Sequence, residues 1–355
     1  MNYGLRIMGS TRHRSSGYTH YNTITVNSGQ VTGTLTNFPM LFAGTYTQLK
    51  TTGNGGYVTN SNGYDIIFSS TTASNGSGKI PFELVSYNAS TGAVIFFVDV
   101  ASMATGSVIY LLYGNSTITT SQQNKSGTWD TNFKQVSHLV ESSGATLNDS
   151  TSNGNNSSTN TGTQTTGKWG NAVTFANGSS QYAAFPNGTI PSGHGSVTIS
   201  AWVNFPNATN YGIVFDPRSS GPPAQGIVSY AVITSGYATG NVTNGSGATA
   251  SEAVNIAVGS WLYVSLTYGG GTGGASSTLS LVVDNHAAAT ATYTGGLPTP
   301  GATCNIGTKT VGGGATTYGT STEQELRISN TVRSAAWIAA DYNNQSAPAS
   351  FYTVT

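Results

Sequence analysis

Carboxylates are scarce in this sequence, which has twelve Asp and Glu residues among 355. Hydrolysis of a glycosidic bond needs two carboxyl groups roughly 5 to 10 Å apart. The nearest candidates are Glu323 and Glu325, which alternation along a strand would place on one face. They lie in a regular strand pattern, S-T-E-Q-E-L-R-I-S, in which Glu325 could pair with Arg327. A structural role is therefore favoured over catalysis.

Other catalytic and cofactor motifs are missing from the sequence. Its five histidines, at positions 13, 20, 138, 194 and 286, form no pair at metal-ligand spacing. There is no nucleophile elbow, phosphate-binding loop or dinucleotide fingerprint. The single cysteine, Cys304, excludes an intrachain disulfide and is predicted to be a small buried residue. His138 is predicted to be partly buried. We therefore expect no enzyme activity.

Aromatic residues among amide and hydroxyl side chains are the remaining candidates for ligand binding. Sugar rings stack on exposed aromatic faces, and neighbouring polar groups bind the sugar hydroxyls. Four tyrosines and Trp202 lie in Asn-, Ser- and Thr-rich segments, although each such residue is more often used for packing than for ligand binding. The four candidate carbohydrate-binding tyrosines are Tyr211, Tyr230, Tyr237 and Tyr318.

The composition predicts an all-β protein. Only 7% of the residues are charged, against about 25% in ordinary domains. Aromatic and β-branched residues are too frequent for a disordered chain. The net charge of zero predicts no attraction to nucleic acid. No apolar run reaches the roughly 20 residues of a membrane span, and we expect no signal peptide because the first residues lack an apolar segment.

Short strands separated by turn signals predict a small β-sandwich over residues 21–133. The runs 93–100 and 108–113 are apolar on both faces and should be central strands. A second sandwich is predicted over residues 134–333. Its clearest strand, 196–205, alternates so that Val197, Ile199 and Val203 share one face.

A short helix and a closing strand are predicted over residues 334–355. Ser334 is a favourable N-cap, strong helix formers follow it, and the polar run N-N-Q-S-A-P should end the helix. The closing strand at 351–354 could return to the first domain. Three tryptophans within the strongest periodic runs are expected to be mostly buried, namely Trp202, Trp261 and Trp337.

Residues 1–20 show no strand periodicity and form a basic arm. Arg6, Arg12 and Arg14 all precede Asp65, the first acidic residue. The arm is interpreted either as a flexible terminus or as an anchor that docks on a neighbouring subunit. In the second interpretation its partners are other copies of the chain or other proteins of a virion or surface assembly.

The segment from residue 129 to 158 contains W-D-T-N-F-K-Q-V-S-H-L-V-E and D-S-T-S-N-G-N-N. It resembles the junction, in bacterial, archaeal and phage surface proteins, between a small β domain of unknown function and a laminin-G-like, concanavalin-type jelly roll. The motifs V-T-N-S-N-G-Y-D-I-I-F and I-Y-L-L-Y-G-N-S resemble the small domain. The motifs S-V-T-I-S-A-W-V, W-L-Y-V-S-L-T-Y and E-L-R-I-S-N resemble the jelly roll. The resemblance implies two jelly-roll sandwiches in tandem.

The resemblance also implies a possible structural calcium ion, although no cofactor is required. Related jelly rolls hold Ca²⁺ between an Asp of an early loop and an Asp late in the chain. Here Asp149, Asn153 and Asn155 match the early loop, whereas the late position is Gln324. Glu323 or Glu325 could compensate for that neutral amide. The alternative is a loop held by its own Asx-turn hydrogen bonds.

The sequence favours a non-catalytic structural or adhesive protein with carbohydrate binding. We expect it on the surface of a phage virion, as a decoration, fibre or tail component, or on a cell surface. One alternative is a polysaccharide-degrading enzyme of the concanavalin-like class, although the E-x-D-x-x-E motif of glucanases in that class is missing. The other alternative is a purely structural virion or filament subunit without a ligand.

Overall fold

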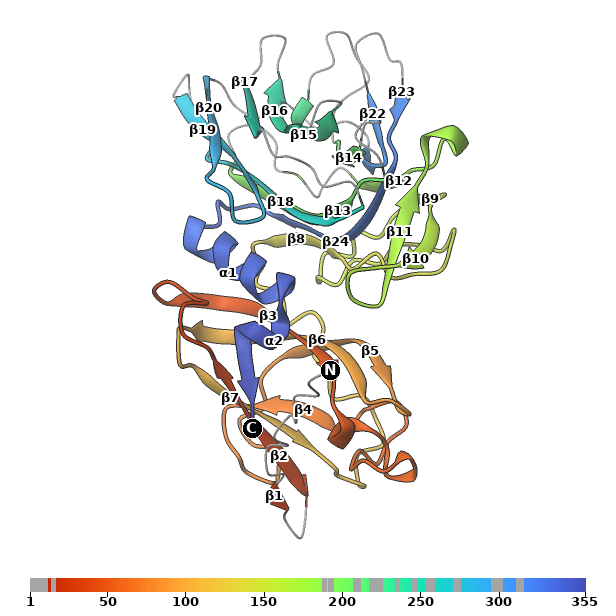
Figure 1. Ribbon diagram of the computed structural model, residues 1–355, viewed down its shortest axis with the longest axis vertical. Helices are drawn as coiled ribbons and strands as arrows, with labels where there is room; N and C mark the ends of the chain where they lie inside the picture. The colour runs from red at the N-terminus through yellow and green to blue at the C-terminus, as the bar shows by residue number, and fades with distance from the viewer. Residues whose placement is uncertain are drawn as a thin grey trace, which may run out of the picture. The chain divides into compact units, whose positions relative to one another are not determined.

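The computed structural model describes residues 12–13, 17–186, 190, 195–206, 212–216, 226–233, 237–243, 248–252, 259–270, 276–294, 303–310 and 316–355. The chain forms two compact units (Figure 1). The first, Met1–Asp130 with Ala335–Thr355, is called the N-terminal unit, and the second, Thr131–Ser334, the central unit. Both consist mainly of antiparallel sheets, which confirms the all-β prediction. No helix in the described ranges is long and apolar enough to cross a membrane.

The described part of the N-terminal unit holds two sheets. One has the order β1-β2-β7-β4 with β25 also paired to β2, and the other has the order β3-β6-β5. The first sheet consists of β1 (Arg12–His13), β2 (His20–Val26), β4 (Ile66–Ser69), β7 (Val108–Tyr113) and β25 (Tyr352–Val354). The second consists of β3 (Leu35–Thr45), β5 (Phe82–Asn88) and β6 (Ala93–Met103), and the short 3₁₀ helices η1 (Thr47–Leu49) and η2 (Thr52–Asn54) follow β3.

Phenylalanine rings join the two sheets of the N-terminal unit. Phe68 of β4 lies with its ring centroid 5.3 Å from that of Phe42 on β3 and 5.2 Å from that of Phe96 on β6. All three side chains are fully buried. Strands β6 and β7 each have a partner on both sides, as their doubly apolar pattern predicted. Burial of such rings is the main favourable contribution to folding of this unit.

The C-terminal tail packs on the N-terminal unit. Helix α1 (Ala335–Ser346) places Trp337 with its ring centroid 5.3 Å from that of Phe38, and Trp337 is buried as predicted. The helix ends at Ser346, within the polar run that was predicted to end it. Asn344 lies in the last turn and bonds both backbone groups of Leu41 on β3, accepting from N–H at 2.6 Å and donating to C=O at 3.0 Å. Helix α2 (Pro348–Phe351) and strand β25 follow.

Several described residues of the basic arm contact the arm's own unit, where Tyr18 is buried and His20 begins β2. Strand β1 forms an antiparallel pair with β2, in which Arg12 lies opposite Tyr21 and His13 opposite His20. The sequence did not predict β1, because residues 1–20 show no strand periodicity. Arg6 and Arg14 lie outside the described residues, so the anchoring role of the arm stays a prediction.

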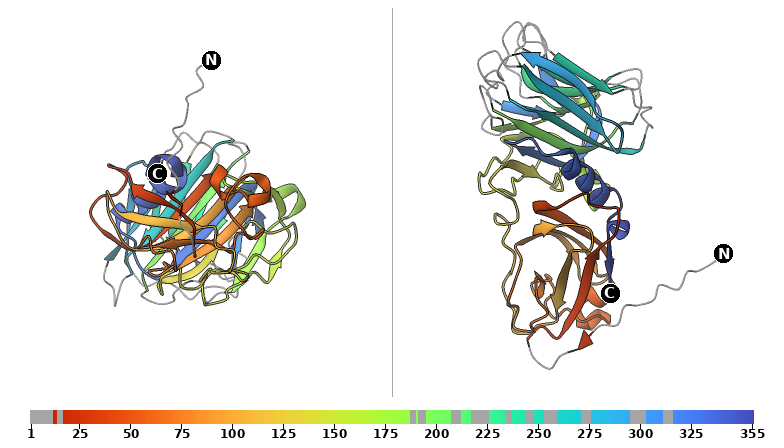
Figure 2. Two further views of the ribbon diagram at one scale, coloured as in Figure 1. Left: turned by 90° about the horizontal axis from the view of Figure 1, so that it is seen from below. Right: turned by 90° about the vertical axis from the view of Figure 1, so that its left-hand side faces the viewer.

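The central unit is built on a sheet of order β10-β11-β24-β13-β18-β19-β20, with β8 also paired to β24. Its strands are β8 (Phe133–Ser137), β10 (Thr163–Thr166), β11 (Asn171–Phe175), β13 (Val197–Asn204), β18 (Trp261–Tyr268), β19 (Ser276–Val283), β20 (Ala289–Thr294) and β24 (Ser321–Ser329). In Figure 1, β13, β18 and β24 form a curved layer, and Figure 2 shows the same layer from two further directions.

Smaller sheets face the concave side of this curved layer (Figure 1). Their strands are β9 (Thr159–Asn160), β12 (Ala183–Pro186), β14 (Gly212–Phe215), β15 (Gly226–Ile233), β16 (Tyr237–Thr243), β17 (Ala248–Glu252), β21 (Thr303–Ile306), β22 (Thr308–Thr310) and β23 (Thr316–Tyr318), and a 3₁₀ helix, η3 (Asn177–Ser179), precedes β12. The layers enclose one apolar core, which contains Cys304 as predicted.

Strand β13 has a core face and an outer face. Val197, Ile199 and Val203 lie in the core, as alternation predicted. Trp202 points to the opposite, outer face, and it is also buried, at 1% exposure. Trp261 begins β18 and has intermediate burial, less complete than that of Trp202 and Trp337. As the first residue of its strand it lies at the edge of the packed region.

Candidate functional site

A β-bulge in β24 determines where the three candidate side chains at positions 323 to 325 point. The pairing between β13 and β24 shifts register between Ser200 and Trp202, and Glu325 adopts a left-handed backbone conformation with φ +61°. Glu323 pairs with Val203 and faces the core, whereas Gln324 pairs with Trp202 on the outer face. The prediction that Glu323 and Glu325 share a face is therefore wrong, because a bulge interrupts the two-residue alternation.

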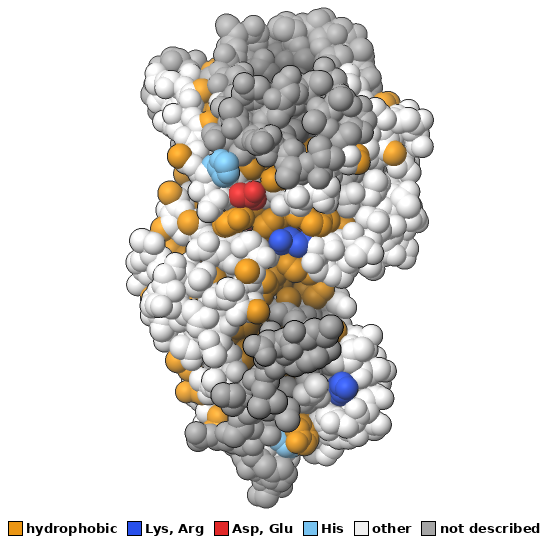
Figure 3. Space-filling view, viewed as in Figure 1, with side chains coloured by type: hydrophobic (Ala, Val, Ile, Leu, Met, Phe, Trp, Pro, Cys, Tyr) orange, Lys and Arg blue, Asp and Glu red, His pale blue; other side chains and the backbone are white. Residues whose placement is uncertain are grey.

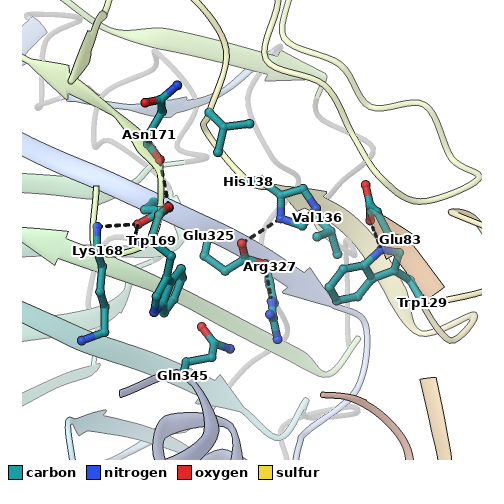
Figure 4. A network of polar contacts seen from close by, with 12 residues as sticks. Glu83, Trp129, Val136, His138, Lys168, Trp169, Asn171, Glu325, Arg327 and Gln345 are labelled. Carbon is teal, nitrogen blue, oxygen red and sulfur yellow. Dashed lines mark hydrogen bonds and ion pairs between the residues drawn. The ribbon is translucent and has the colours of Figure 1, made fainter. Parts of the chain in front are cut away.

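Glu325 joins two basic side chains in a buried ion network (Figure 4). Its Oε2 lies 2.7 Å from Nδ1 of His138, and its Oε1 accepts a hydrogen bond of 2.9 Å from Nε of Arg327. All three side chains are buried. Burial by itself would raise the pKa of Glu325, but the charges and hydrogen bonds of His138 and Arg327 outweigh it and hold the pKa below its usual value. The predicted pairing of Glu325 with Arg327 is confirmed. The Glu325 carboxylate therefore has a structural role.

Glu323 lies in an apolar environment. It is fully buried, its Oε1 accepts a hydrogen bond of 2.7 Å from the Ser321 hydroxyl, and its Oε2 has no hydrogen-bond partner among the described residues. Burial raises the pKa of Glu323 well above its usual value, and the hydrogen bond from Ser321 acts weakly in the opposite direction. The neutral acid is therefore the form that suits this site.

Substituting Glu323 with Gln should remove a destabilisation that grows with pH. The pKa of Glu323 is higher in the folded state, so the folded protein binds the proton more tightly than the unfolded chain. The resulting stabilisation is complete below the unfolded pKa of about 4.3 and is lost as pH rises towards the folded pKa. Urea unfolding should show the variant gaining on the natural protein by at most about 1.4 kcal/mol per pH unit over that window. A difference that does not vary between pH 4 and 8 would contradict this assignment.

The candidate calcium loop is closed by its own hydrogen bonds. Oδ1 of Asp149 accepts from the backbone N–H groups of Val136 and Thr151, and Oδ2 accepts from the Thr151 hydroxyl and from N–H of Asn155 at 2.8 Å each. The amide groups of Asn153 and Asn155 donate to backbone carbonyls, among them Lys134. Both carboxylate oxygens of Asp149 therefore accept hydrogen bonds from the protein itself. This arrangement matches the alternative interpretation, a loop held by its own Asx-turn hydrogen bonds.

The partners expected for a calcium ion also point elsewhere. Glu323 faces the core and Glu325 binds His138 and Arg327. Over the described ranges, no group of three His, Cys, Asp or Glu side chains is placed to hold a metal ion. The oxygen atoms of this loop do not fit Ca²⁺, because the ion requires several free oxygen ligands and these oxygens already accept hydrogen bonds.

Gln324 holds the turn between β10 and β11. Its Oε1 accepts from N–H of Lys168 at 2.9 Å, and its Nε2 donates to the carbonyls of Trp169 and Asn171. Figure 4 shows these backbone segments beside each other. A neutral amide at position 324 supplies both a donor and acceptor, which a carboxylate could not. This requirement explains the Gln residue at the position where the resemblance would place an acid.

Of the four candidate tyrosines, Tyr318 is the one whose side chain the structure describes. Tyr211 lies outside the described residues, and Tyr230 and Tyr237 lie in β15 and β16 with side chains outside the description. Tyr318 ends β23, and its ring centroid lies 6.2 Å from that of Tyr182, which precedes β12. Both rings are partly exposed.

Polar side chains lie on the segments next to Tyr182. Thr161 and Thr163 are exposed, and Gln181 donates from Nε2 to the Thr163 hydroxyl at 3.1 Å. The Thr161 hydroxyl lies 2.9 Å from the Tyr182 nitrogen and accepts its hydrogen. Partly exposed rings beside hydroxyl and amide groups are suited to bind sugars. Tyr182 was not singled out from the sequence, because its proximity to Tyr318 arises only from strand packing.

A second aromatic cluster covers the outer face of β13. Trp202 contacts the rings of Trp169 and Tyr263, at centroid distances of 5.8 and 5.4 Å. Nζ of Lys168 lies 4.1 Å from the centroid of the Trp202 ring. Burial lowers the pKa of Lys168, and the nearby carboxylate of Asp284 acts in the opposite direction. Trp202 was a sequence candidate, but the other members of the cluster were not.

Asp284 is held rigidly at the edge of this cluster. Its Oδ1 accepts from N–H of Tyr263 at 2.8 Å, and its own N–H donates to the Tyr263 carbonyl at 2.8 Å. Its backbone is left-handed, with φ +53°, a conformation that Asp tolerates better than most residues. Burial raises the pKa of Asp284, and the Tyr263 hydrogen bond, His286 and Lys168 act against that rise.

A cleft in the N-terminal unit has a volume of about 460 Å³. Apolar residues such as Ile80, Val100 and Ile109 line it, together with Lys79 and Asp99. The pKa of Asp99 rises to about 6, first through burial and second through the charge of Asp130. A carboxyl group with a raised pKa that lines a cleft is a feature that acid catalysts share.

Comparisons with known proteins identify the central fold. Residues 177–339 match the family model of the concanavalin A-like lectin/glucanases superfamily. No curated protein matches the sequence.

Solved structures similar to this chain include the binding domain of Paraclostridial Mosquitocidal Protein 1, with 11% identity, 58% of this chain and 52% of that chain covered, and a TM-score of 0.42. The botulinum neurotoxin serotype C1 binding domain has 12% identity, coverage of 60% and 52%, and a TM-score of 0.43. The botulinum neurotoxin type G receptor binding domain has 11% identity, coverage of 61% and 52%, and a TM-score of 0.43. The matches span about half the length of these chains. From the family match, residues 177–339 form a concanavalin A-like lectin/glucanase domain.

Proposed function

We propose that the central unit is a non-catalytic carbohydrate-binding domain whose sugar-binding surface includes Tyr182 and Tyr318. The observation that carries this proposal is the pairing of two partly exposed rings, 6.2 Å apart, beside exposed threonine hydroxyls and a glutamine amide. Stacking binds the apolar face of a sugar ring, and the polar groups bind its hydroxyls. The superfamily that residues 177–339 match includes lectins by its description.

The positions of Glu323 and Glu325 support binding without hydrolysis. A glycosidase holds its two carboxyl groups on the two sides of one bond. Here Glu323 faces the core while Glu325 is bound to two bases on the outer face. Neither side chain is placed for proton transfer to a bound sugar. Display on a virion or cell surface stays a prediction. Detection of the protein in purified particles, or among surface-accessible peptides, would test it.

Glycan arrays followed by affinity gel electrophoresis test the proposal. Tyr182→Ala and Tyr318→Ala should each weaken binding of the best neutral glycan by about tenfold, or ~1.4 kcal/mol, because each removes one stacking surface. Tyr21 and Tyr110 provide a matched control, because they form another partly exposed pair with centroids 6.2 Å apart, in the N-terminal unit. Tyr110→Ala should leave binding unchanged.

Two results would overturn the proposal. One is binding by the Tyr182→Ala/Tyr318→Ala double variant that equals binding by the natural protein. The other is release of soluble sugars from a polysaccharide panel, abolished by Asp99→Asn. The second result would establish the alternative, an enzyme, for which the raised pKa of Asp99 is the specific observation.

A further inference from the structure

The charged side chains around Trp202 form a cluster separate from the tyrosine pair. Lys168, Asp284 and His286 come from two turns of the central unit, those after β10 and after β19. His286 is exposed, and Lys168, Trp169 and Asp284 are partly exposed. Figure 3 shows a face with few charges on which an acidic, a histidine and a basic side chain gather beside hydrophobic ones. Such a gathering is unusual in a chain with only 7% charged residues.

Lys168 presents an ammonium group that has no hydrogen-bond acceptor among the residues that the structure describes. Its Nζ lies over the Trp202 ring at 4.1 Å, and no hydrogen bond or ion pair of this group occurs in the described part of the chain. Its backbone is held by Gln324, so the base of the side chain is fixed. A cation that is partly buried on an aromatic ring, with its hydrogen-bond donors unused, is suited to receive an anionic group.

Asp284 presents the opposite chemistry. Its Oδ1 is occupied by the Tyr263 N–H, whereas Oδ2 accepts no hydrogen bond from any described residue. An ionised carboxylate is an acceptor only and can bind hydroxyl groups of a ligand. It also repels simple anions such as phosphate. The ligand must therefore carry hydroxyl donors beside its negative charge.

The geometry points to a second binding site, on the surface formed by Lys168, Trp169 and Asp284, for an acidic carbohydrate such as a uronic acid residue. The sugar carboxylate binds Lys168, its hydroxyls bind Asp284, and its ring packs against the exposed part of Trp169. A ring that carries both a carboxylate and hydroxyls satisfies all three groups, whereas a neutral sugar leaves the ammonium unsatisfied. The site deepens the proposed function, since it takes the same class of ligand through different residues.

Calorimetric titration with a galacturonate oligomer and with its methyl ester tests this site. The two probes share the same rings, but the ester lacks the charge. The acid form should bind at least about tenfold more tightly, the factor of one charge-assisted contact. Its affinity should fall as ionic strength rises, because salt screens the ion pair.

Lys168→Met keeps the apolar stem over Trp202 and removes the charge. It should weaken binding of the acid form about tenfold, to the level of the ester, and leave the ester unchanged. Lys134→Met is the matched control, since Lys134 is a partly exposed lysine of the same unit whose Nζ donates to the Thr131 carbonyl. It should bind both probes as the natural protein does.

The outcomes separate this site from the tyrosine pair. Acid-specific binding that survives in the Tyr182→Ala/Tyr318→Ala variant and disappears in Lys168→Met supports the site, even if the neutral-glycan proposal fails. Equal binding of acid and ester by the natural protein, no binding of either, or an equal loss in Lys134→Met and Lys168→Met would overturn it. Near-ultraviolet circular dichroism of Lys168→Met, unchanged from the natural protein, would show that the tryptophan cluster is intact.

Discussion

Glu325→Gln should destabilise the central unit by about 3 to 5 kcal/mol, the usual cost of removing one partner from a buried ion pair. The substitution keeps the shape of the side chain but removes the charge that compensates Arg327, whose side chain is 1% exposed and lies 2.9 Å away. His138 loses its ionic partner at the same time. Urea unfolding at pH 7 measures the effect.

The pH dependence of this loss identifies its cause. The pKa of Glu325 is lowered in the folded state, so its contribution is present above the unfolded pKa of about 4.3 and is lost as pH falls through the folded pKa. The difference in the free energy of unfolding between the natural protein and the variant should therefore become smaller in acid. Glu141→Gln is the control, because Glu141 is only partly buried and accepts hydrogen bonds from Val140 and Asn148. An unchanged urea midpoint for Glu325→Gln would contradict the ion network.

Trp202→Ala should lower the free energy of unfolding by about 3 to 5 kcal/mol, because removal of a large buried ring leaves a cavity. The ring is 1% exposed and contacts Trp169, Tyr263 and the Lys168 ammonium. Its removal takes away the surface on which the turn after β10 rests. Differential scanning calorimetry should show a lower melting temperature for the central unit.

Trp261→Ala is the matched comparison for Trp202→Ala. Trp261 lies on the neighbouring strand β18 but is only partly buried, so the same substitution removes less buried surface and should cost clearly less. Equal losses for the two variants would show that the register of β13 and β18 is not the one described. The same register pairs Trp202 with Tyr263 and Asn204 with Trp261.

The strands and their core faces could be predicted from the sequence because their signal is local. Alternation of two residues placed Val197, Ile199 and Val203 in the core, and the doubly apolar patterns of β6 and β7 marked them as central. The pattern A-A-W-I-A-A after Ser334 likewise predicted a helix with Trp337 inward. In each case backbone geometry determines which side chains share a face, and it requires no knowledge of distant residues.

The candidate sites depended on contacts between distant segments. The bulge at Glu325 shifts the alternation by one position, and it is specified by packing against β13 and β8 as well as by local propensity. Tyr182 meets Tyr318, and Lys168 reaches Trp202, only when strands far apart in sequence pair. The early loop could bind calcium by composition, but the donors that occupy Asp149 come partly from Val136 on another strand. Residue types therefore determined which chemistry was available, and tertiary structure decided which groups meet, because side-chain contacts depend on register and loop closure rather than on spacing along the chain.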